Sequence, residues 1–353
     1  MRKLGWLRSI FVVRRPDEIE DHAQRIGNPG NVRLVESERP SGRAELIGEW
    51  VVIRILSTKA LTEASIGDRC GRWLTWVKNN ETAGWRVRQI EMIVETILDH
   101  VLPVRCGPEE KVLGERFKQE LQELSNTRVQ QTELWQDICL ALQRCAATED
   151  PIYFTRWPPI ASTMVNNSSP TVVAAYLALR GSAEWREVWR PLLRHPRYGH
   201  PPAFLPYPLG NPITVMHAGH LHYFRKAMGQ CFLGVDCVVD LGAGYGSMCR
   251  IVSRLGFHGS YLIFDQPPIL ALQRYFLALH GIDSSYGEGS AQVSLYSDLE
   301  ELRKHLNHGG FHRIAVMSTW ALSEMPLTFR AGIEPILDTD KCVVVLFAYQ
   351  AEF

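Results

Sequence analysis

The chain has 353 residues, of which 46% are hydrophobic and 22% are charged. These proportions exclude the low hydrophobicity that keeps a chain disordered, and the length suggests two domains of ordinary size. Lysine plus arginine and aspartate plus glutamate are equal, at 38 each, so no excess of positive charge favours nucleic acid or an anionic membrane as the main partner.

The first residues are basic, but their longest apolar run, 10–13, is too short for a signal-peptide core or a membrane span. The eight cysteines include no CxxC pair and no zinc-type spacing with histidine. We therefore expect a cytoplasmic protein with buried or incidental thiols, no bound metal and no membrane span.

Apolar residues at spacings of three and four predict helices in the N-terminal part of the chain. Such spacing occurs over 85–101, 113–124 and 134–142. Ser169 and Pro170 have the character of an N-cap and a first-turn proline, with Gly181 as the stop of a fourth helix. We expect residues 1–195 to form a mainly α-helical N-terminal region.

The stretch from His195 to Pro212 contains six prolines and cannot form regular structure for long. Residues 196–236 are therefore read as a proline-rich connection and a cap segment. The rest, 237–353, alternates β-rich runs with helical ones, which predicts an α/β, Rossmann-like domain with helices on both faces of a parallel sheet. The five expected strands are CVVDL, SYLIFD, AQVSLY, RIAVMST and KCVVVLF.

The sharpest motif is VVDLGAGYGS, in which a hydrophobic strand runs into alternating glycines and then into a helix. Gly242, Gly244 and Gly246 have no side chains, so the backbone can turn sharply and approach a ligand closely. The position of the third glycine of a dinucleotide fingerprint is Ser247, while Asp240 stands two residues before the first glycine. The DxGxGxG form resembles motif I of class I S-adenosylmethionine-dependent methyltransferases, and a carboxylate there suits the cationic methionine end of that cofactor. A tight turn without a ligand is the alternative.

A second carboxylate, Asp265, ends the next strand, where an acid accepts hydrogen bonds from ribose hydroxyls in both cofactor families. Asp298 is a weaker candidate for adenine contact, with a helix N-cap as its alternative. Ser318 and Thr319 reach the same edge of the sheet and could equally be ordinary strand-end residues. The full set of expected S-adenosyl-L-methionine contacts is Asp240, Gly242, Ala243, Gly244, Tyr245, Gly246, Asp265, Gln266, Asp298, Ser318 and Thr319.

Flanking segments extend the resemblance. In four segments the chain is similar to the sugar O-methyltransferases of bacterial polysaccharide biosynthesis. The segments are residues 209–212 (LGNP), VVDLGAGYGSMCRIV, FDQPPILALQRYFL and STWALSE. The similarity covers 209–353. It implies a sugar hydroxyl as methyl acceptor, on a saccharide or a nucleotide sugar, whereas the residues themselves lead only to the cofactor.

The superfamily pattern has seven strands, the last two forming a hairpin beside the fifth, yet the chain stops at Phe353, directly after the fifth expected strand. The final strand hairpin is therefore expected to be missing. Either the chain is truncated or N-terminal segments complete the sheet. An uncovered fifth strand would be an exposed edge that could pair with another copy, which allows a homo-oligomer.

Methyl transfer to a sugar hydroxyl calls for a general base, and histidine is the commonest choice. His217 and His220 are the first candidates and Glu324 is the next, with surface or structural roles as the alternative. Tyr207, Trp157 and Trp320 could stack on a sugar ring or simply pack in the core.

The sequence thus favours an S-adenosylmethionine-dependent O-methyltransferase. A nicotinamide-dependent oxidoreductase is a rival that Ser247 and Asp240 argue against. A scaffold that keeps the fold without catalysis is a rival outside enzymology.

Overall fold

The computed structural model describes residues 7–14, 42–47, 50–55, 107–124, 132–165, 169–194, 196–228, 232, 234–289 and 291–350. The helix expected over 85–101 lies outside the described residues. Among the described helices, none combines the length and the apolar character that a membrane crossing requires.

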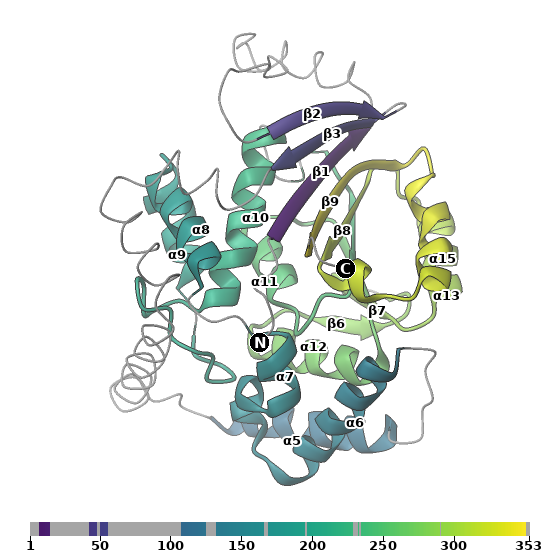
Figure 1. Cartoon of the computed structure of the whole chain (residues 1–353). Coiled ribbons are helices and arrows are strands. Elements are labelled where there is room, and N and C mark those ends of the chain that lie inside the picture. Colours follow the sequence, from purple (N-terminus) through teal and green to yellow (C-terminus); the bar gives the residue numbers. More distant parts are fainter. Residues whose placement is uncertain are drawn as a thin grey trace.

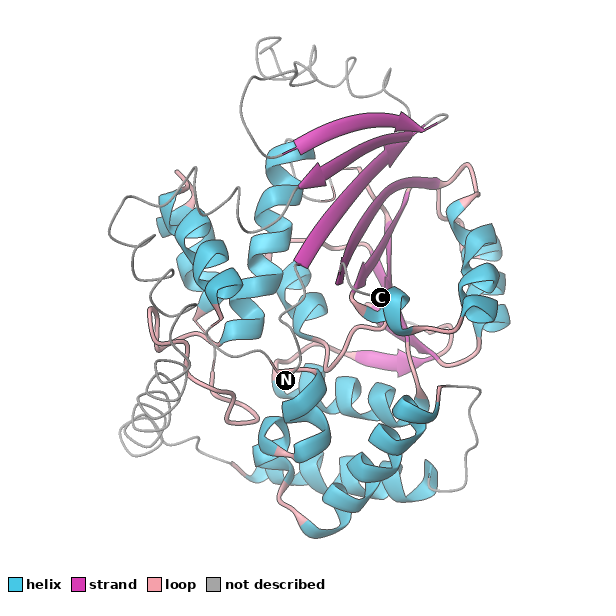
Figure 2. Cartoon of the chain, viewed as in Figure 1, coloured by secondary structure: helices cyan, strands magenta, loops and turns pink. Residues whose placement is uncertain are grey.

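The described strands form one nine-stranded sheet in the order β2-β3-β1-β9-β8-β4-β5-β7-β6. Strands are magenta in Figure 2. The last six strands of the sheet, from β9 to β6, are all parallel. This confirms the expected α/β, Rossmann-like class. The parallel strands are β4 (Cys237–Leu241), β5 (Ser260–Phe264), β6 (Ser284–Tyr286), β7 (Val293–Tyr296), β8 (Ile314–Thr319) and β9 (Cys342–Gln350).

Alternate residues of the central strands enter two different cores, as the period of two in a strand requires. Val239 and Leu241 pack against α13 (Leu299–His308) and α15 (Leu327–Leu337) on one face. Val238 belongs to the core on the other face, with α10 (Pro212–Met228), α11 (Ser247–Arg254) and α12 (Pro267–Leu279). Helices therefore cover both faces of the parallel sheet, on opposite sides in Figure 1.

The described helices of the N-terminal region continue this second core. Phe117 on α5 (Pro108–Glu123) stacks on Tyr275 of α12, with ring centroids 4.9 Å apart. The N-cap expected at Ser169 is present, because its hydroxyl accepts a hydrogen bond from the Val172 amide. Three helices expected from apolar spacing or capping are confirmed, namely α5, α6 (Glu133–Thr148) and α8 (Pro170–Gly181). The described residues of this region also form four short helical segments, which are η2 (Pro151–Arg156), α7 (Pro158–Thr163), η3 (Trp185–Trp189) and α9 (Arg190–Leu193).

The N-terminal region also contains three strands that the sequence analysis did not predict. β1 (Leu7–Arg14) pairs antiparallel with β9, β3 (Trp50–Ile55) pairs with β1, and β2 (Gly42–Ile47) lies outermost. Of the two alternatives left open for the edge beside β9, the structure has completion of the sheet by N-terminal segments. Pairing between residues more than 300 positions apart in the chain leaves no local signal in the sequence.

The boundaries at 195 and 236 stay a prediction. α10 packs on α8 and on α11, so segments from all three expected parts meet in one core. Cooperative unfolding is expected of a shared core.

Phe117→Ala tests this shared core. The side chain is 1% exposed and lies between α5 and α12, so we expect the free energy of unfolding to fall by about 3 to 5 kcal/mol in a single transition. Denaturant titration followed by fluorescence and circular dichroism measures it. Val112→Ala, on the same helix at 68% exposure, is the control and should change stability by less than about 0.5 kcal/mol. Two separate transitions would contradict the account.

Candidate active site

The glycine loop connects β4 to α11 at the carboxyl edge of the sheet. Gly242, Gly244 and Gly246 have φ values of 73°, 59° and 93°, in the left-handed region that favours glycine. A Cβ on Gly242 would lie 2.1 Å from the Cβ of Ala321, whereas a Cβ on Gly244 would meet no atom within 4 Å. The backbone at Gly244 therefore borders open space, and Gly242 is closely covered by the segment that follows β8.

Asp265 lies beside this loop at the end of β5. Its Oδ1 accepts a hydrogen bond from the Gln266 amide at 2.8 Å, and its Oδ2 accepts one from Gln273 Nε2 at 2.8 Å. The same Gln273 nitrogen donates to the Gly244 carbonyl oxygen at 2.8 Å, and the Ala243 amide also bonds to the carboxylate. One buried amide thus fixes the position of Asp265 relative to the glycine loop. A carboxylate has about four acceptor positions, so three donors leave about one for a ligand.

Burial raises the pKa of Asp265 to about 7, although its backbone and side-chain hydrogen bonds and Asp240 also act on it. The hydrogen bonds favour the charged form, and the neighbouring carboxylate of Asp240 opposes it. The two predicted acids are therefore close enough to interact, as a shared site requires.

Asp240 points into the core on the α11 side rather than to solvent. It is 1% exposed, and Tyr261 Oη donates to its Oδ2 at 2.7 Å. Burial raises the pKa of Asp240 to about 7, against the opposing effect of the Tyr261 hydrogen bond. The partner of Asp240 is thus a tyrosine on the neighbouring strand, which ties β4 to β5.

Other predicted cofactor contacts already have structural partners. Asp298 is the N-cap of α13, with Oδ1 accepting from the Glu300 and Glu301 amides at 2.7 and 3.0 Å. Ser318 Oγ donates to the Leu241 carbonyl oxygen at 2.9 Å and accepts from the Leu322 amide at 3.2 Å. Asp298 is therefore a helix N-cap and Ser318 has the hydrogen bonds of a strand-end residue. Ligand contact by either residue stays a prediction.

The remaining candidates surround the same strand ends. Tyr245 packs its ring against Phe276, at 4.9 Å between centroids, so its side chain is buried in the core. Thr319 is buried at the end of β8. Gln266 has a buried Oε1 with no hydrogen-bond partner among the described residues.

His217 and His220 lie on α10 and meet Trp320 at the end of β8. Their ring centroids are 5.9 and 5.7 Å from that of Trp320, and each histidine is 5% exposed. Trp320 has a φ of 73°, which is a strained conformation for a residue with a side chain. Both histidines therefore lie near the carboxyl end of β8.

Both histidines are neutral in the folded protein. Burial lowers the pKa of His217 to about 3, with further lowering by His220 and Arg250, and burial lowers the pKa of His220 to about 4. The neutral imidazole is the form that accepts a proton, although such low pKa values weaken it as a base. Nδ1 of each ring is buried without a hydrogen-bond partner among the described residues.

Glu324 lies in α14 (Ala321–Glu324), just past β8, and hydrogen-bonds with the Trp135 side chain of α6. Burial raises the pKa of Glu324, and this hydrogen bond opposes the rise. A residue of the helical N-terminal region thus contacts the connection that covers Gly242.

Three residues that the sequence analysis did not single out shape the site: Gln273, Tyr261 and Arg250. A signal existed for two of them. Gln273 follows the apolar run PPILAL, and Arg250 lies between the apolar pairs MC and IV, which is a pattern that indicates a buried polar side chain.

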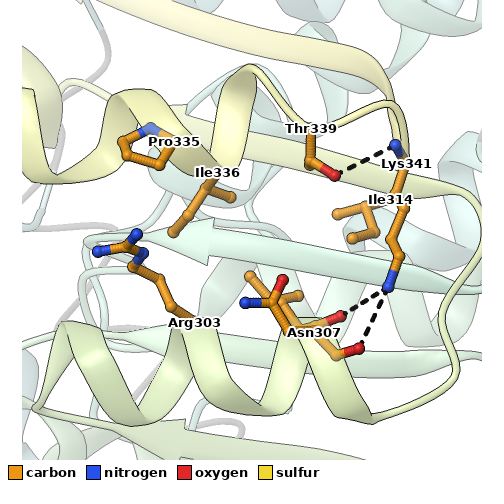
Figure 3. A pocket seen from close by; sticks show the side chains of 8 residues that line it. Arg303, Asn307, Ile314, Pro335, Ile336, Thr339 and Lys341 are labelled. Carbon is orange, nitrogen blue, oxygen red and sulfur yellow. Dashed lines mark hydrogen bonds between the residues drawn. The ribbon is translucent and has the colours of Figure 1, made fainter.

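A cavity of about 60 Å³ lies elsewhere, between α13 and α15. Ile314, the first residue of β8, lines it, so the cavity is at the amino edge of the parallel sheet, opposite the glycine loop (Figure 3). Lys341 Nζ donates there to the Leu306 and Asn307 carbonyl oxygens at 3.2 and 3.4 Å. This cavity is not part of the candidate site.

Comparisons with known proteins were made by sequence and by structure. No protein-family model and no curated protein sequence matches the chain. Among solved structures, the mitomycin 7-O-methyltransferase MmcR is similar at 13% identity with a TM-score of 0.22, over 70% of this chain and 75% of that chain. A similarity of this size assigns neither a family nor a function.

Asp240→Asn tests the raised pKa of the buried acid. With a folded pKa of about 7 and an unfolded value of 3.8, the folded state holds a proton that the unfolded state has lost, so this residue lowers wild-type stability as pH rises through that window. The variant keeps the Tyr261 hydrogen bond without the charge. We expect its stability relative to wild type to rise from pH 5 to pH 7 by an amount on the order of 1 kcal/mol per unit. Denaturant titrations across pH measure this, and a constant difference between the two proteins would contradict it.

Proposed function

We propose that this protein is an S-adenosylmethionine-dependent O-methyltransferase acting on a hydroxyl of a sugar or saccharide. One observation carries the proposal. A glycine loop with open space at Gly244 lies beside the Asp265 carboxylate of the next strand, and Gln273 joins the two. In an open parallel sheet the carboxyl ends of the strands are where nucleoside ligands bind.

The residues of this edge fit the proposed cofactor. Asp265 would take one ribose hydroxyl at its remaining acceptor position, and the buried Oε1 atoms of Gln266 and Gln273, which lack partners among the described residues, would accept from the nucleoside. Unpaired buried acceptors are costly, so a donor from a ligand is favoured there. When bound, this cofactor supplies a methyl group on a positively charged sulfur.

The same residues disfavour a nicotinamide dinucleotide. α11 begins at Ser247 with the acid Asp240 buried beneath the loop, so a second negative charge from a pyrophosphate at this point would be repelled whenever Asp240 is ionised. A cationic ligand end is favoured instead. This supports S-adenosylmethionine over the oxidoreductase alternative.

For the acceptor, we propose that His217 or His220 receives the hydroxyl proton. Both are neutral and face Trp320, whose half-buried ring would lie against one face of a sugar. Displacement at a methyl carbon depends mainly on alignment of acceptor and donor, which a rigid, buried edge provides. Glu324 is the alternative base. A cytoplasmic role in polysaccharide biosynthesis goes with this proposal.

A non-catalytic scaffold is the second candidate. It is favoured by the three hydrogen bonds that Asp265 already receives and by the low pKa values of both histidines. In this case the cofactor edge would keep its structure but no acceptor would be methylated.

Calorimetric titration with S-adenosylhomocysteine tests the proposal. We expect saturable binding by the wild-type chain, none with NAD, and affinity at least tenfold weaker for Asp265→Asn, because a hydrogen bond to a charged acceptor contributes about 1.5 to 3 kcal/mol. Asp338→Asn, an exposed acid at the end of α15, is the matched control and should bind as the wild type does.

Absence of sulfur-nucleoside binding by folded protein would sink the methyltransferase proposal. Binding without methyl transfer to any of a panel of saccharides would support the scaffold.

A further inference from the structure

Arg250 is a cation in the interior of the protein. Its side chain is 0% exposed, and Nη2 donates a hydrogen bond to the Leu192 carbonyl oxygen at 3.5 Å. Nε and Nη1 are buried without a hydrogen-bond partner among the described residues. Burial lowers the pKa of Arg250 to about 10, so the guanidinium still carries its charge at neutral pH.

No described negative group balances the positive charge of Arg250. Within the described part of the chain no carboxylate forms an ion pair with it, and the groups that interact with it electrostatically include the cation Arg254 and the neutral His217 and His280. An unpaired buried charge costs several kcal/mol, whereas an apolar residue of similar volume would cost nothing comparable. Such a residue makes sense where a negative group binds in the working protein.

Arg250 lies one turn into α11, the helix that follows the glycine loop. It interacts electrostatically with Tyr245 of that loop and with His217 of α10. α10 packs on α11 and contributes His217.

The surrounding buried atoms without partners are mainly donors. Trp320 Nε1 can only donate, Arg250 offers three N–H groups at Nε and Nη1, and Nδ1 of His217 and of His220 can donate in one tautomer. A ligand that satisfies several converging donors is rich in acceptors, as a carboxylate or phosphate is, and a guanidinium binds either in a two-pronged manner. Trp320 is partly exposed, so this group of hydrogen-bond donors reaches the protein surface at Trp320.

We propose that Arg250 binds an anionic group, a carboxylate or a phosphate, carried by the methyl acceptor. The inference rests on the proposed function and narrows it. The acceptor is then a charged saccharide, such as a uronate or a sugar phosphate, and its negative group lies between α10 and α11 while its hydroxyl faces the histidines.

Inorganic phosphate is the probe, with thermal unfolding of the full chain as the readout. We expect phosphate to raise the melting temperature of the wild type more than chloride at equal ionic strength, by an increment that saturates. Arg250→Met should lose this increment. It should also unfold about 2 °C or more above the wild type in chloride alone, because a buried unpaired charge has been replaced by an apolar side chain.

Three further variants serve as controls for Arg250→Met. Arg254→Met removes an exposed cation of the same helix and should keep the phosphate response. Arg186→Met should keep it too, although Arg186 lines an exposed hollow with Arg180 and Arg190 where phosphate could also bind. Arg250→Lys keeps the positive charge but loses the planar guanidinium. It should retain part of the phosphate response and serves as the test if Arg250→Met fails to fold.

Several results would overturn the inference. These are no phosphate response in the wild type, an unchanged response in Arg250→Met, or a melting temperature of Arg250→Met well below that of the wild type, which would make the guanidinium a structural clamp on Leu192. A fourth is weaker binding of S-adenosylhomocysteine but not of methylthioadenosine by Arg250→Met, since the anion would then be the carboxylate of the cofactor. Phosphate binding through Arg250 in a protein that ignores S-adenosylhomocysteine would refute the proposed function alone.

Discussion

The candidate site depends on one side-chain amide. Gln273 projects from α12 and donates from Nε2 to both the Gly244 carbonyl oxygen and Asp265 Oδ2, each at 2.8 Å. Because Gly244 follows β4 and Asp265 follows β5, this amide fixes two strand ends relative to each other and to the helix behind them. Without this amide, no described side chain would hold the glycine loop, with its left-handed φ values, in a fixed position relative to the Asp265 carboxylate, with its raised pKa.

Other buried polar groups near this edge have atoms without a hydrogen-bond partner in the part of the chain that the structure describes. Arg250, His217, His220, Trp320 and the two glutamine oxygens all have buried atoms without partners among the described residues. Native interiors pair most of their polar groups, so these atoms support the proposed ligand site at the carboxyl ends of the parallel strands. The carboxylates lie toward β5, where the proposed cofactor with its positive charge would bind. The hydrogen-bond donors lie toward α10, where the proposed anionic group of the acceptor would bind.

The local parts of this structure could be predicted from the sequence. The strand and helix at Val238 and Ser247, the cap at Ser169 and the acid ending β5 follow from short-range patterns of apolar, glycine and capping residues. The pairing of β1 with β9 could not be predicted, because it depends on residues at opposite ends of the chain. The partners of Gln273 and Arg250 could not be predicted either, since a polar residue beside an apolar run indicates burial but not which groups it contacts. The prediction that Asp240 faces a cofactor remains untested, and its carboxylate accepts a hydrogen bond from Tyr261.

The most direct test of the account is a crystal structure of the chain with S-adenosylhomocysteine. The account predicts the ribose at the Asp265 carboxylate, the backbone of Gly244 against the ligand, and the sulfur on the side of His217 and Trp320. A ligand bound away from the carboxyl edge of the sheet, or one at this edge that leaves Asp265 and the glycine loop without contact, would contradict it.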